Sequence, residues 1–329
     1  MKTFATPTRN LFAAVVLMAL AWAAGAQQAF PNKPIRLLTP YAPGGSTDVV
    51  SRIVAPELAK LLGVSVVVEN MAGANGNIAL SYLTRAPADG HTVLITSTSP
   101  IVINPHTYPN APHDALRDFT PISLVANTES AIVVNPAVPA TNLKELIDLS
   151  KQRPVFFGIS GLGGQPEMII RKINKDTGAK FELVPFAGGG PAITGALGGH
   201  VDVVLNDVGS SLVPMLATGK LRGLVVLDPK DKSEFLPGTT TSSAQGFPRY
   251  VSYSWLFLLG PPGMPAQTAE RLRKAMADVL AQEDIAQKFK TNALIPAPSR
   301  SAGEAREFIS QQNDFFRTMQ RETGVRVTQ

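Results

Sequence analysis

The 329-residue chain contains no cysteine. This absence excludes disulfide bonds, thiolate-bound zinc, iron–sulfur clusters, a cysteine nucleophile and a lipid anchor attached through an N-terminal cysteine. Histidine is almost as scarce, and the four residues form neither an i,i+4 pair nor another metal-ligand spacing: His91, His106, His113 and His200. We therefore expect no metal site, no cofactor and no catalytic histidine.

The chain also has little excess charge of either sign. Charged residues make up 17% of it, and the formal net charge is only +5. Two of the cations, Lys2 and Arg9, precede an apolar run from Leu11 to Ala24 that ends in Ala24-Gly25-Ala26. This pattern is typical of a secretory signal peptide, here residues 1–26. Without these two cations the net charge falls to +3, which is too weak to indicate nucleic-acid binding.

No segment is long and apolar enough to cross a membrane. The run from Leu11 to Ala24 is shorter than the roughly 20 residues that a spanning helix needs, and no later segment qualifies. Removal of residues 1–26 on export is the preferred interpretation, with an uncleaved N-terminal anchor as the alternative. The remainder, in a chain that is 44% hydrophobic without periodic glycine or proline, is expected to be an exported, soluble globular protein.

What the sequence does have is a regular alternation of short β-branched runs with stretches whose apolar residues recur at helical spacing. This alternation predicts an α/β fold with largely parallel sheets covered by helices on both faces. The expected strands are Ile35–Thr39, Val66–Glu69, Thr92–Thr96, Ala131–Val134, Val155–Gly158, Phe181–Val184, Val201–Leu205, Leu221–Leu227 and Trp255–Leu259. The expected helices cover about 46–62, 142–152, 166–178, 268–289 and 302–323, and Pro56 is expected to kink the first or divide it in two.

Two breaks in the pattern suggest how the chain is divided. A strand pattern followed by Asn135-Pro136 and Val138-Pro139 lies at 127–139, and a polar stretch rich in Lys, Ser, Thr, Gly and Pro lies at 228–248. The first part contains too few strands for a stable sheet of its own. We expect a discontinuous lobe 1 from 27–128 and 229–329, with lobe 2, residues 129–228, inserted between them.

The most informative feature is a glycine-rich loop between a strand and a helix. Tyr41-Ala42-Pro43-Gly44-Gly45-Ser46-Thr47-Asp48 follows Ile35–Thr39 directly. Glycine lets the backbone approach a ligand, and a helix N-terminus offers amide donors and a partial positive charge. The loop is interpreted either as an anion site or as a plain tight turn with an N-cap, and Asp48 is expected to face its own backbone.

Other strands end in loops of the same kind: Ser97-Thr98-Ser99, Ser160-Gly161-Leu162-Gly163-Gly164-Gln165 and Ala187-Gly188-Gly189-Gly190. In open α/β sheets, ligands bind beyond the carboxyl ends of the strands. Loops from both lobes are therefore expected to face each other across a cleft that holds a small, polar, anionic solute.

Single residues near these loops leave alternatives open. Asp207 follows a strand and is interpreted as a cap of the next helix or, alternatively, as the acceptor of an ammonium or hydroxyl group of the ligand. Tyr41 and Phe186 either line the cleft or pack in the core, and Trp255 is expected in the core. Ser160 resembles a hydrolase nucleophile, but Leu162 stands where the G-x-S-x-G motif needs glycine, so a secreted serine hydrolase is kept only as an alternative.

The chain also resembles the Bug family, the solute receptors of tripartite tricarboxylate transporters. The similar segments run in order along the mature chain: Phe30–Arg36, Pro40–Asp48, Val67–Asn70, Gly73–Ile78, Ala86–Gly90, Val184–Phe186 with Gly188-Gly189, Leu197–Asp202, Thr218–Arg222 and Pro261–Gly263. The resemblance implies a periplasmic binding protein of the two-lobe type II kind, in which each lobe is a mixed sheet flanked by helices and joined to the other by crossing strands.

The resemblance further implies a monomeric periplasmic receptor that delivers a small carboxylate to the membrane subunits of such a transporter. A receptor that signals instead of transporting is the alternative. The carboxylate would be held by amides, hydroxyls and ordered waters rather than by an arginine. The expected ligand-binding residues are Tyr41, Ala42, Gly44, Gly45, Ser46, Thr47, Ser97, Thr98, Ser99, Ser160, Gly163, Gly164, Gln165, Ala187, Gly188, Gly189 and Asp207.

Overall fold

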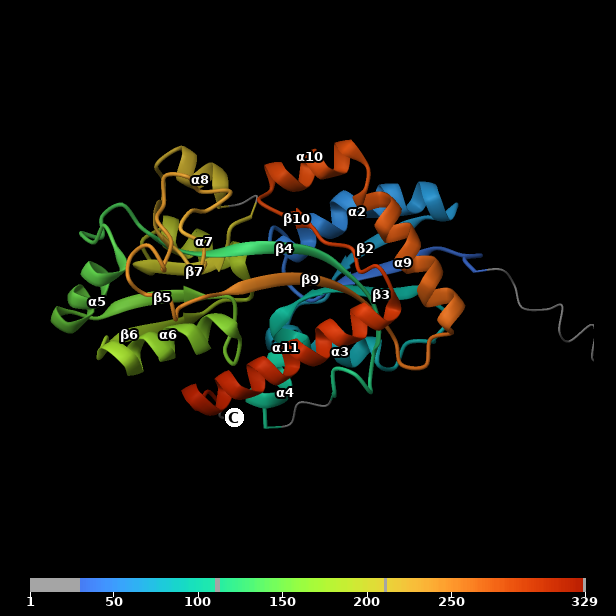
Figure 1. The fold of residues 1–329 in the computed structure, drawn as a ribbon, viewed down its shortest axis with the longest axis horizontal. Helices are drawn as coiled ribbons and strands as arrows, with labels where there is room; N and C mark the ends of the chain where they lie inside the picture. Colours follow the sequence, from blue (N-terminus) through green and yellow to red (C-terminus); the bar gives the residue numbers. More distant parts are fainter. Residues whose placement is uncertain (1–29, 110–112, 210–211, 328–329) are drawn as a thin grey trace, which may run out of the picture.

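The computed structural model describes residues 30–109, 113–209 and 212–327. Its helices and strands form two α/β lobes that lie side by side, as the sequence predicts (Figure 1). The expected signal peptide, residues 1–26, lies outside the described residues. Among the helices that are described, none has the length and apolarity to cross a bilayer.

Lobe 1 is built on a mixed sheet in the order β2-β1-β3-β9-β4, with β10 added beside β4. The pairs β1–β2 and β1–β3 are parallel, whereas β9 runs antiparallel to both β3 and β4. The strands are β1 (Ile35–Thr39), β2 (Val66–Asn70), β3 (Thr92–Ser97), β4 (Thr120–Val134), β9 (Tyr253–Gly260) and β10 (Ile295–Pro296).

Helices cover both faces of this sheet. On one face, α2 (Ser46–Leu62), α9 (Ala266–Leu280) and α10 (Glu283–Thr291) enclose one hydrophobic core. On the other face, a second core lies under α3 (Asn77–Leu83) and α11 (Ala302–Thr323). A 3₁₀ turn (Ala74–Gly76), a π-helix (Ser99–Ile103) and α4 (Asn104–Thr107) complete the lobe near the cleft.

Lobe 2 repeats this plan with a sheet in the order β8-β4-β7-β5-β6. Its strands are β5 (Val155–Ile159), β6 (Phe181–Pro185), β7 (Val203–Asp207) and β8 (Arg222–Val226), and its helices are α5 (Leu143–Gln152), α6 (Gln165–Thr177), α7 (Gly189–Leu197) and α8 (Val213–Ala217). One core lies beneath α5 and α6, and another lies beneath α7. Parallel strands alternating with helices therefore place several strand-to-helix loops at the edge that faces lobe 1.

The 15-residue strand β4 passes through both sheets. It pairs with β9 as far as Glu129 and with β7 from Ser130 onward, so its partners change at the predicted lobe boundary. The segment after β8 does not return to lobe 1 at once, because Leu236 and Tyr250 are buried in the two cores of lobe 2. We propose that lobe 2 extends beyond the predicted end at 228 and that lobe 1 resumes with β9.

Several local predictions need correction. Helix α2 runs through Pro56 as one 17-residue helix and is not divided. The expected helix 268–289 is two helices, because Gln282 has an extended backbone that ends α9 and redirects α10 so that Ile285 and Phe289 pack in the same core. Strand β4 is longer than predicted, since its polar residues are satisfied by neighbouring strands, and β10 was not predicted.

Candidate functional site

A polar cavity lies between the two lobes, where the loops after β1, β3, β5 and β7 meet. The space open to the centres of water molecules is about 60 Å³. Its lining consists of Tyr41, Gly45, Ser46, Thr47, Ser97, Thr98, Ser99, Ser130, Ser160, Gln165, Pro166, Gly189, Leu205, Asn206, Asp207, Ser252, Ser254 and Leu256. The cavity suits a small polar solute.

The lobe 1 wall is the start of α2. Gly44 has a positive φ of 91°. Gly45 is the N-cap residue of α2, and no side chain makes a capping hydrogen bond at this helix start. The Gly44 amide donates to Asp48 Oδ2 at 3.1 Å, as expected for a carboxylate that faces its own backbone. Arg52 and Asn70 hold the same carboxylate at 3.0 and 2.9 Å. Although burial opposes the shift, these contacts lower the pKa of Asp48 below its ordinary value.

The lobe 2 wall repeats this arrangement at the start of α6. Gly163 has a φ of 74°, and Gly164 is the N-cap, again without a side-chain cap. The Gly163 amide donates to Glu167 Oε2 at 2.7 Å, and Arg171 donates to Glu167 Oε1 at 2.6 Å. Both loops therefore follow the pattern Gly-Gly-x-x-Asp/Glu-x-x-x-Arg, at 44–52 and 163–171. We call them the paired cradles; this short repeat was missed at the sequence level although its spacing is visible there.

A third helix begins at the cavity. The N-cap of α7 is Gly188, with a φ of 145°, and no side chain caps this helix. Gly189 lines the cavity so closely beside Asn206 that an added Cβ would lie 2.4 Å from the Asn206 side-chain oxygen. Outside the cavity, by contrast, Asn142 caps α5 and Ser301 caps α11, whereas α9 and α10 lack side-chain caps. Glycine at three cavity-facing N-caps lets a solute approach the first-turn amides directly.

Hydroxyl groups from the end of β3 form the roof of the cavity. Ser97 donates to the Tyr41 hydroxyl at 3.3 Å, and that hydroxyl donates to Asn75 Oδ1 at 3.2 Å. The Ser99 hydroxyl accepts a hydrogen bond from the backbone amide of Gln165 in lobe 2 at 3.2 Å. Burial raises the pKa of Tyr41 above its ordinary value, so its phenol remains protonated and able to donate.

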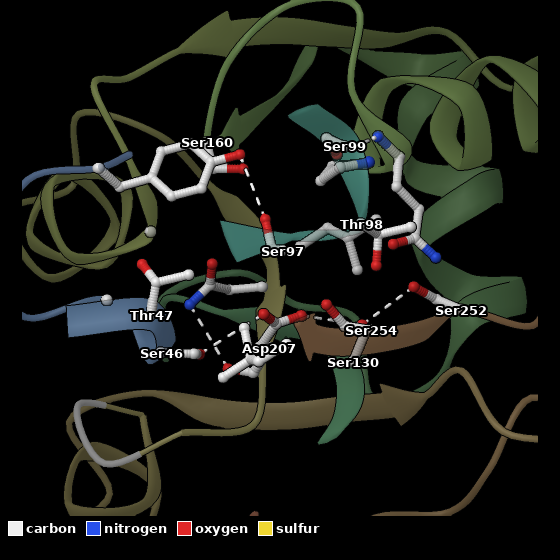
Figure 2. A pocket seen from close by; sticks show the side chains of 18 residues that line it. Ser46, Thr47, Ser97, Thr98, Ser99, Ser130, Ser160, Asp207, Ser252 and Ser254 are labelled. Atoms are coloured by element: carbon white, nitrogen blue, oxygen red, sulfur yellow. Dashed lines mark hydrogen bonds between the residues drawn. The ribbon is translucent and has the colours of Figure 1, made fainter. Parts of the chain in front are cut away.

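Asp207 lies on the opposite side of the cavity, at the end of β7 (Figure 2). It accepts from Ser130 Oγ at 3.3 Å and from Ser46 Oγ at 3.5 Å, and Ser254 also hydrogen-bonds to it. Burial raises the pKa of Asp207 to about 6, and these hydroxyls only partly offset that effect. Its side chain therefore faces the cavity, not the next helix, for which the sequence suggested it as a cap.

The cavity has no positive side chain: within the lining that the structure describes there is no lysine, arginine or histidine. Nor do the described residues contain a group of acidic or histidine side chains placed to share a metal ion. A bound anion would therefore depend on amides, hydroxyls and helix dipoles, which is the mode of recognition expected from the sequence.

The structure brings most of the predicted binding residues together around the cavity. Tyr41 is one of them, so of its two predicted positions, cleft or core, it lies in the cleft. Six of them lie outside the lining: Ala42, Gly44, Gly163, Gly164, Ala187 and Gly188. Gly163 has a different role, because a Cβ there would lie 2.6 Å from Val327 and 2.7 Å from Tyr108 of lobe 1. Phe186 packs inside lobe 2 beside Gly158 and Gly195, and Trp255 is in the core as expected.

Sequence reasoning missed the lining residues Ser130, Pro166, Leu205, Asn206, Ser252, Ser254 and Leu256. Most lie on β4, β7 and β9 or just before them, not on glycine-rich loops. A usable signal was present: Ser130, Asn206 and Ser254 are polar residues inside or beside otherwise apolar strands, where a buried hydroxyl or amide needs a partner.

Two α/β lobes that enclose a polar cavity lined by helix N-termini define the class of periplasmic-type solute-binding proteins. The chain belongs to the TctC family, described as "Tripartite tricarboxylate transporter family receptor", whose model matches residues 50–324. The fold class and family expected from the sequence are thus confirmed, and the protein is a solute-binding receptor.

The relatives agree with this assignment. Protein BugT of Bordetella pertussis is 31% identical over 301 residues, which cover 91% of each chain. A solved structure described as a periplasmic transporter has a TM-score of 0.85 at 31% identity and covers 91% of this chain and 99% of its own. R. palustris Rpa4515, solved with adipate, has a TM-score of 0.84 at 26% identity, with 90% and 99% coverage.

The family consists of binding proteins and not of enzymes. The alternative of a serine hydrolase using Ser160 is therefore not supported. Ser160 lies in the cavity wall, on the side away from Asp207 (Figure 2), and none of the described lining residues is a histidine or lysine that could serve as its base.

Proposed function

We propose that this receptor captures a small carboxylate between its two lobes in the periplasm and delivers it to the membrane subunits of a tripartite tricarboxylate transporter. Export through a signal peptide at 1–26 and a monomeric state are parts of the same proposal. The family description names a transporter, which favours transport over the signalling alternative. A relative solved with adipate supports a carboxylate ligand.

The paired cradles carry this proposal. At the start of α2 in lobe 1 and of α6 in lobe 2, glycine is the N-cap and an acidic residue already accepts a hydrogen bond from the amide of the preceding glycine. The carboxylate in the third helical position fixes the loop, while the first-turn backbone faces the cavity. Oriented amides at a helix N-terminus bind anions without a cationic side chain. The lining residues proposed for ligand contact are those from Gly45 to Thr47, Ser97 to Ser99, and Gln165, with Tyr41, Ser160, Gly189 and Asp207.

Contacts between the lobes explain how the ligand would be retained. Tyr108 donates to the Leu162 carbonyl at 2.9 Å, and Thr107 donates to the Gly163 carbonyl at 2.8 Å. Farther from the cavity, Lys175 of α6 donates to the Glu322 carbonyl of α11 at 2.8 Å. A ligand that touches both cradles stabilises this closed arrangement, because those contacts exist together only when the lobes meet.

A thermal-shift screen of the mature protein against carboxylic acids tests the proposal. A ligand at 100 times its Kd adds about 2.7 kcal/mol to the free energy of unfolding. We expect one or a few small carboxylates to raise the Tm and most compounds to leave it unchanged. If amines or neutral sugars stabilise the protein and no carboxylate does, the proposal is wrong.

Gly45→Val tests the position of the site. Gly45 has an ordinary φ of −83°, and a Cβ there would approach only the Ala42 carbonyl, at 4.0 Å, so the fold has room for the side chain. Valine would fill the space beside the first turn of α2, and carboxylate affinity is expected to fall by at least about tenfold. Gly238→Val is the matched control, since a Cβ there meets nothing within 4 Å. Unchanged affinity in the Gly45 variant would move the site elsewhere.

A further inference from the structure

Asp207 is an unusual group for a cavity that receives anions. It is the one acidic side chain among the described lining residues, and no cation in that lining balances it. It lies within hydrogen-bond reach of Ser46, the first residue of α2, so it shares the region where a ligand carboxylate is proposed to bind. A second negative charge at this place weakens anion binding unless it serves another purpose.

The contacts of Asp207 leave it capable of accepting more hydrogen bonds. An ionised carboxylate can accept about four hydrogen bonds, and the contacts of Asp207 with Ser130 and Ser46 are long, at 3.3 and 3.5 Å. Ser130 in turn accepts from Ser252 at 2.9 Å, so the hydroxyl cluster is oriented with its hydrogens pointing toward Asp207. Donors are directed at this carboxylate from lobe 1, from β4 and from the start of β9.

Asp207 stays mostly in its ionised, accepting form at neutral pH, although its buried surroundings disfavour the charge. Burial raises the pKa of Asp207 to about 6, which still leaves it mostly ionised at neutral pH. The other titratable group of the described lining is the Tyr41 phenol. Glu129, the neighbour of Ser130 on β4, is turned away and accepts from Ser233 and from the Glu234 amide. Among the described residues, no cation lines the cavity or offsets the charge of Asp207.

We propose that Asp207 selects ligands that carry a hydrogen-bond donor close to their carboxylate, so that the receptor prefers short hydroxy- or amino-carboxylates over the plain acids of the same length. This inference rests on the proposed carboxylate-binding function. The carboxylate is held by the first turn of α2, and the hydroxyl or ammonium group donates to Asp207. A hydroxyl or ammonium lies within a bond or two of the carboxylate in such compounds, which fits the short distance between the first turn of α2 and Asp207.

Calorimetry on matched ligand sets at pH 7.5 tests the inference. Within each set the chain length is the same, the hydroxy acid adds only a neutral donor and the amino acid adds a cationic one: propionate, lactate and alanine; succinate, malate and aspartate; glutarate, 2-hydroxyglutarate and glutamate. In the set whose length fits, we expect the donor-bearing member to bind about ten- to 100-fold more tightly than the plain acid, as for a hydrogen bond to a charged group. Equal or tighter binding of the plain acid overturns the inference.

Asp207→Asn assigns the preference to this residue. Asparagine keeps the size but loses the charge, so the preference is expected to shrink to within about threefold while the plain acid binds as well as before or better. Asp284→Asn on the exposed face of α10 is the control and is expected to keep the wild-type preference. An unchanged preference in the Asp207 variant overturns the assignment, and if this variant fails to fold, the wild-type ligand sets still decide.

A measurement of proton uptake on binding tests the opposite role of Asp207, that of a hydrogen-bond donor to the ligand. If it were protonated on binding and donated to the ligand, a plain dicarboxylate would bind with proton uptake, seen as a binding enthalpy that changes with the ionisation enthalpy of the buffer. Such uptake overturns the inference without touching the proposed function. Failure of every carboxylate to bind the wild type, by contrast, overturns the proposed function itself.

Discussion

At the scale of single residues, Asp207 is proposed to select the ligand, but its buried charge lowers the stability of the empty protein at neutral pH. Its carboxylate is ionised at neutral pH in a place that raises its pKa from 3.8 to about 6. Because the folded protein holds this proton more tightly than the unfolded chain does, the contribution of Asp207 to the free energy of unfolding falls between about pH 4 and pH 6 and stays low above that.

Asp207→Asn is therefore expected to stabilise the empty protein at neutral pH, by on the order of 1–3 kcal/mol. The gain is expected to be full above about pH 6 and to vanish near pH 4, where both forms of the protein carry a neutral side chain. Urea denaturation of both proteins at pH 7.5 and pH 4 measures it. A loss of stability at pH 7.5 would show that the hydroxyl cluster depends on the charge.

Gly163 acts on binding without lining the cavity. Its positive φ and the closeness of Tyr108 and Val327 leave no room for a Cβ when the lobes are together. Gly163→Ala is expected to weaken ligand binding by more than about tenfold, because the closed arrangement must open to admit the methyl group.

Gly178→Ala provides the matched control for this prediction. Gly178 ends α6 with a nearly identical φ of 71°, and a Cβ there meets nothing within 4 Å. Both variants are expected to lose about 1–2 kcal/mol of stability from the left-handed backbone, but only the Gly163 variant is expected to lose affinity. Equal affinities in calorimetry would contradict a role for Gly163 in closure.

At the scale of elements, α2 begins at the lobe 1 cradle and contains a proline, Pro56, in its interior. The helix continues through Pro56, whose side chain is exposed and which has no amide to donate to the preceding turn. The apolar residues Val50, Val54 and Leu58 on its buried face hold the helix together by packing against β1 and α9.

Pro56→Ala is expected to stabilise the protein by about 1–3 kcal/mol, since alanine restores the backbone donor and has the highest helix propensity. Ligand affinity is expected to stay unchanged, because Pro56 lies more than two turns from Ser46. Thermal melting and calorimetry of the same samples measure both quantities. A drop in stability would mean that the surrounding helices require the bend that proline imposes.

At the scale of the whole molecule, both polar and apolar contacts join the lobes, and Met168 of lobe 2 is fully buried in the core under α3 and α11 of lobe 1. Thr107 and Tyr108 of lobe 1 donate to carbonyl groups of Leu162 and Gly163 in lobe 2. The main connection is β4, together with the return of the chain into β9. A connection through these strands allows the lobes to move relative to one another as a hinge.

Tyr108→Phe is expected to lower ligand affinity by roughly two- to tenfold, the effect of one hydrogen bond that forms only on closure. The stability of the empty protein is expected to change little. Tyr82→Phe removes a hydroxyl that contacts Arg36 within lobe 1 and is expected to leave affinity unchanged. Small-angle scattering with and without ligand provides the second measure, and a radius of gyration that no bound ligand changes would contradict closure.

Much of this architecture could be predicted from the sequence, because strands, helices and their connecting loops follow from local residue patterns. Short β-branched runs and helical spacing predicted most strands and helices, and α11 was predicted to the residue. The glycine-rich loops predicted the cradles, because glycine at a helix start has a direct conformational meaning. The cavity-facing positions of Gly45 to Thr47 and of Ser97 to Ser99 followed from them.

The tertiary structure alone decided what depends on contacts between distant segments. Ser130, Ser252 and Ser254 enter the cavity because β4, β7 and β9 become neighbours, and no local pattern reports that pairing. The same contacts turned Asp207 from a possible helix cap into a cavity group. Local patterns encode backbone conformation, whereas the partners and the charge environment of a side chain are properties of the folded chain as a whole.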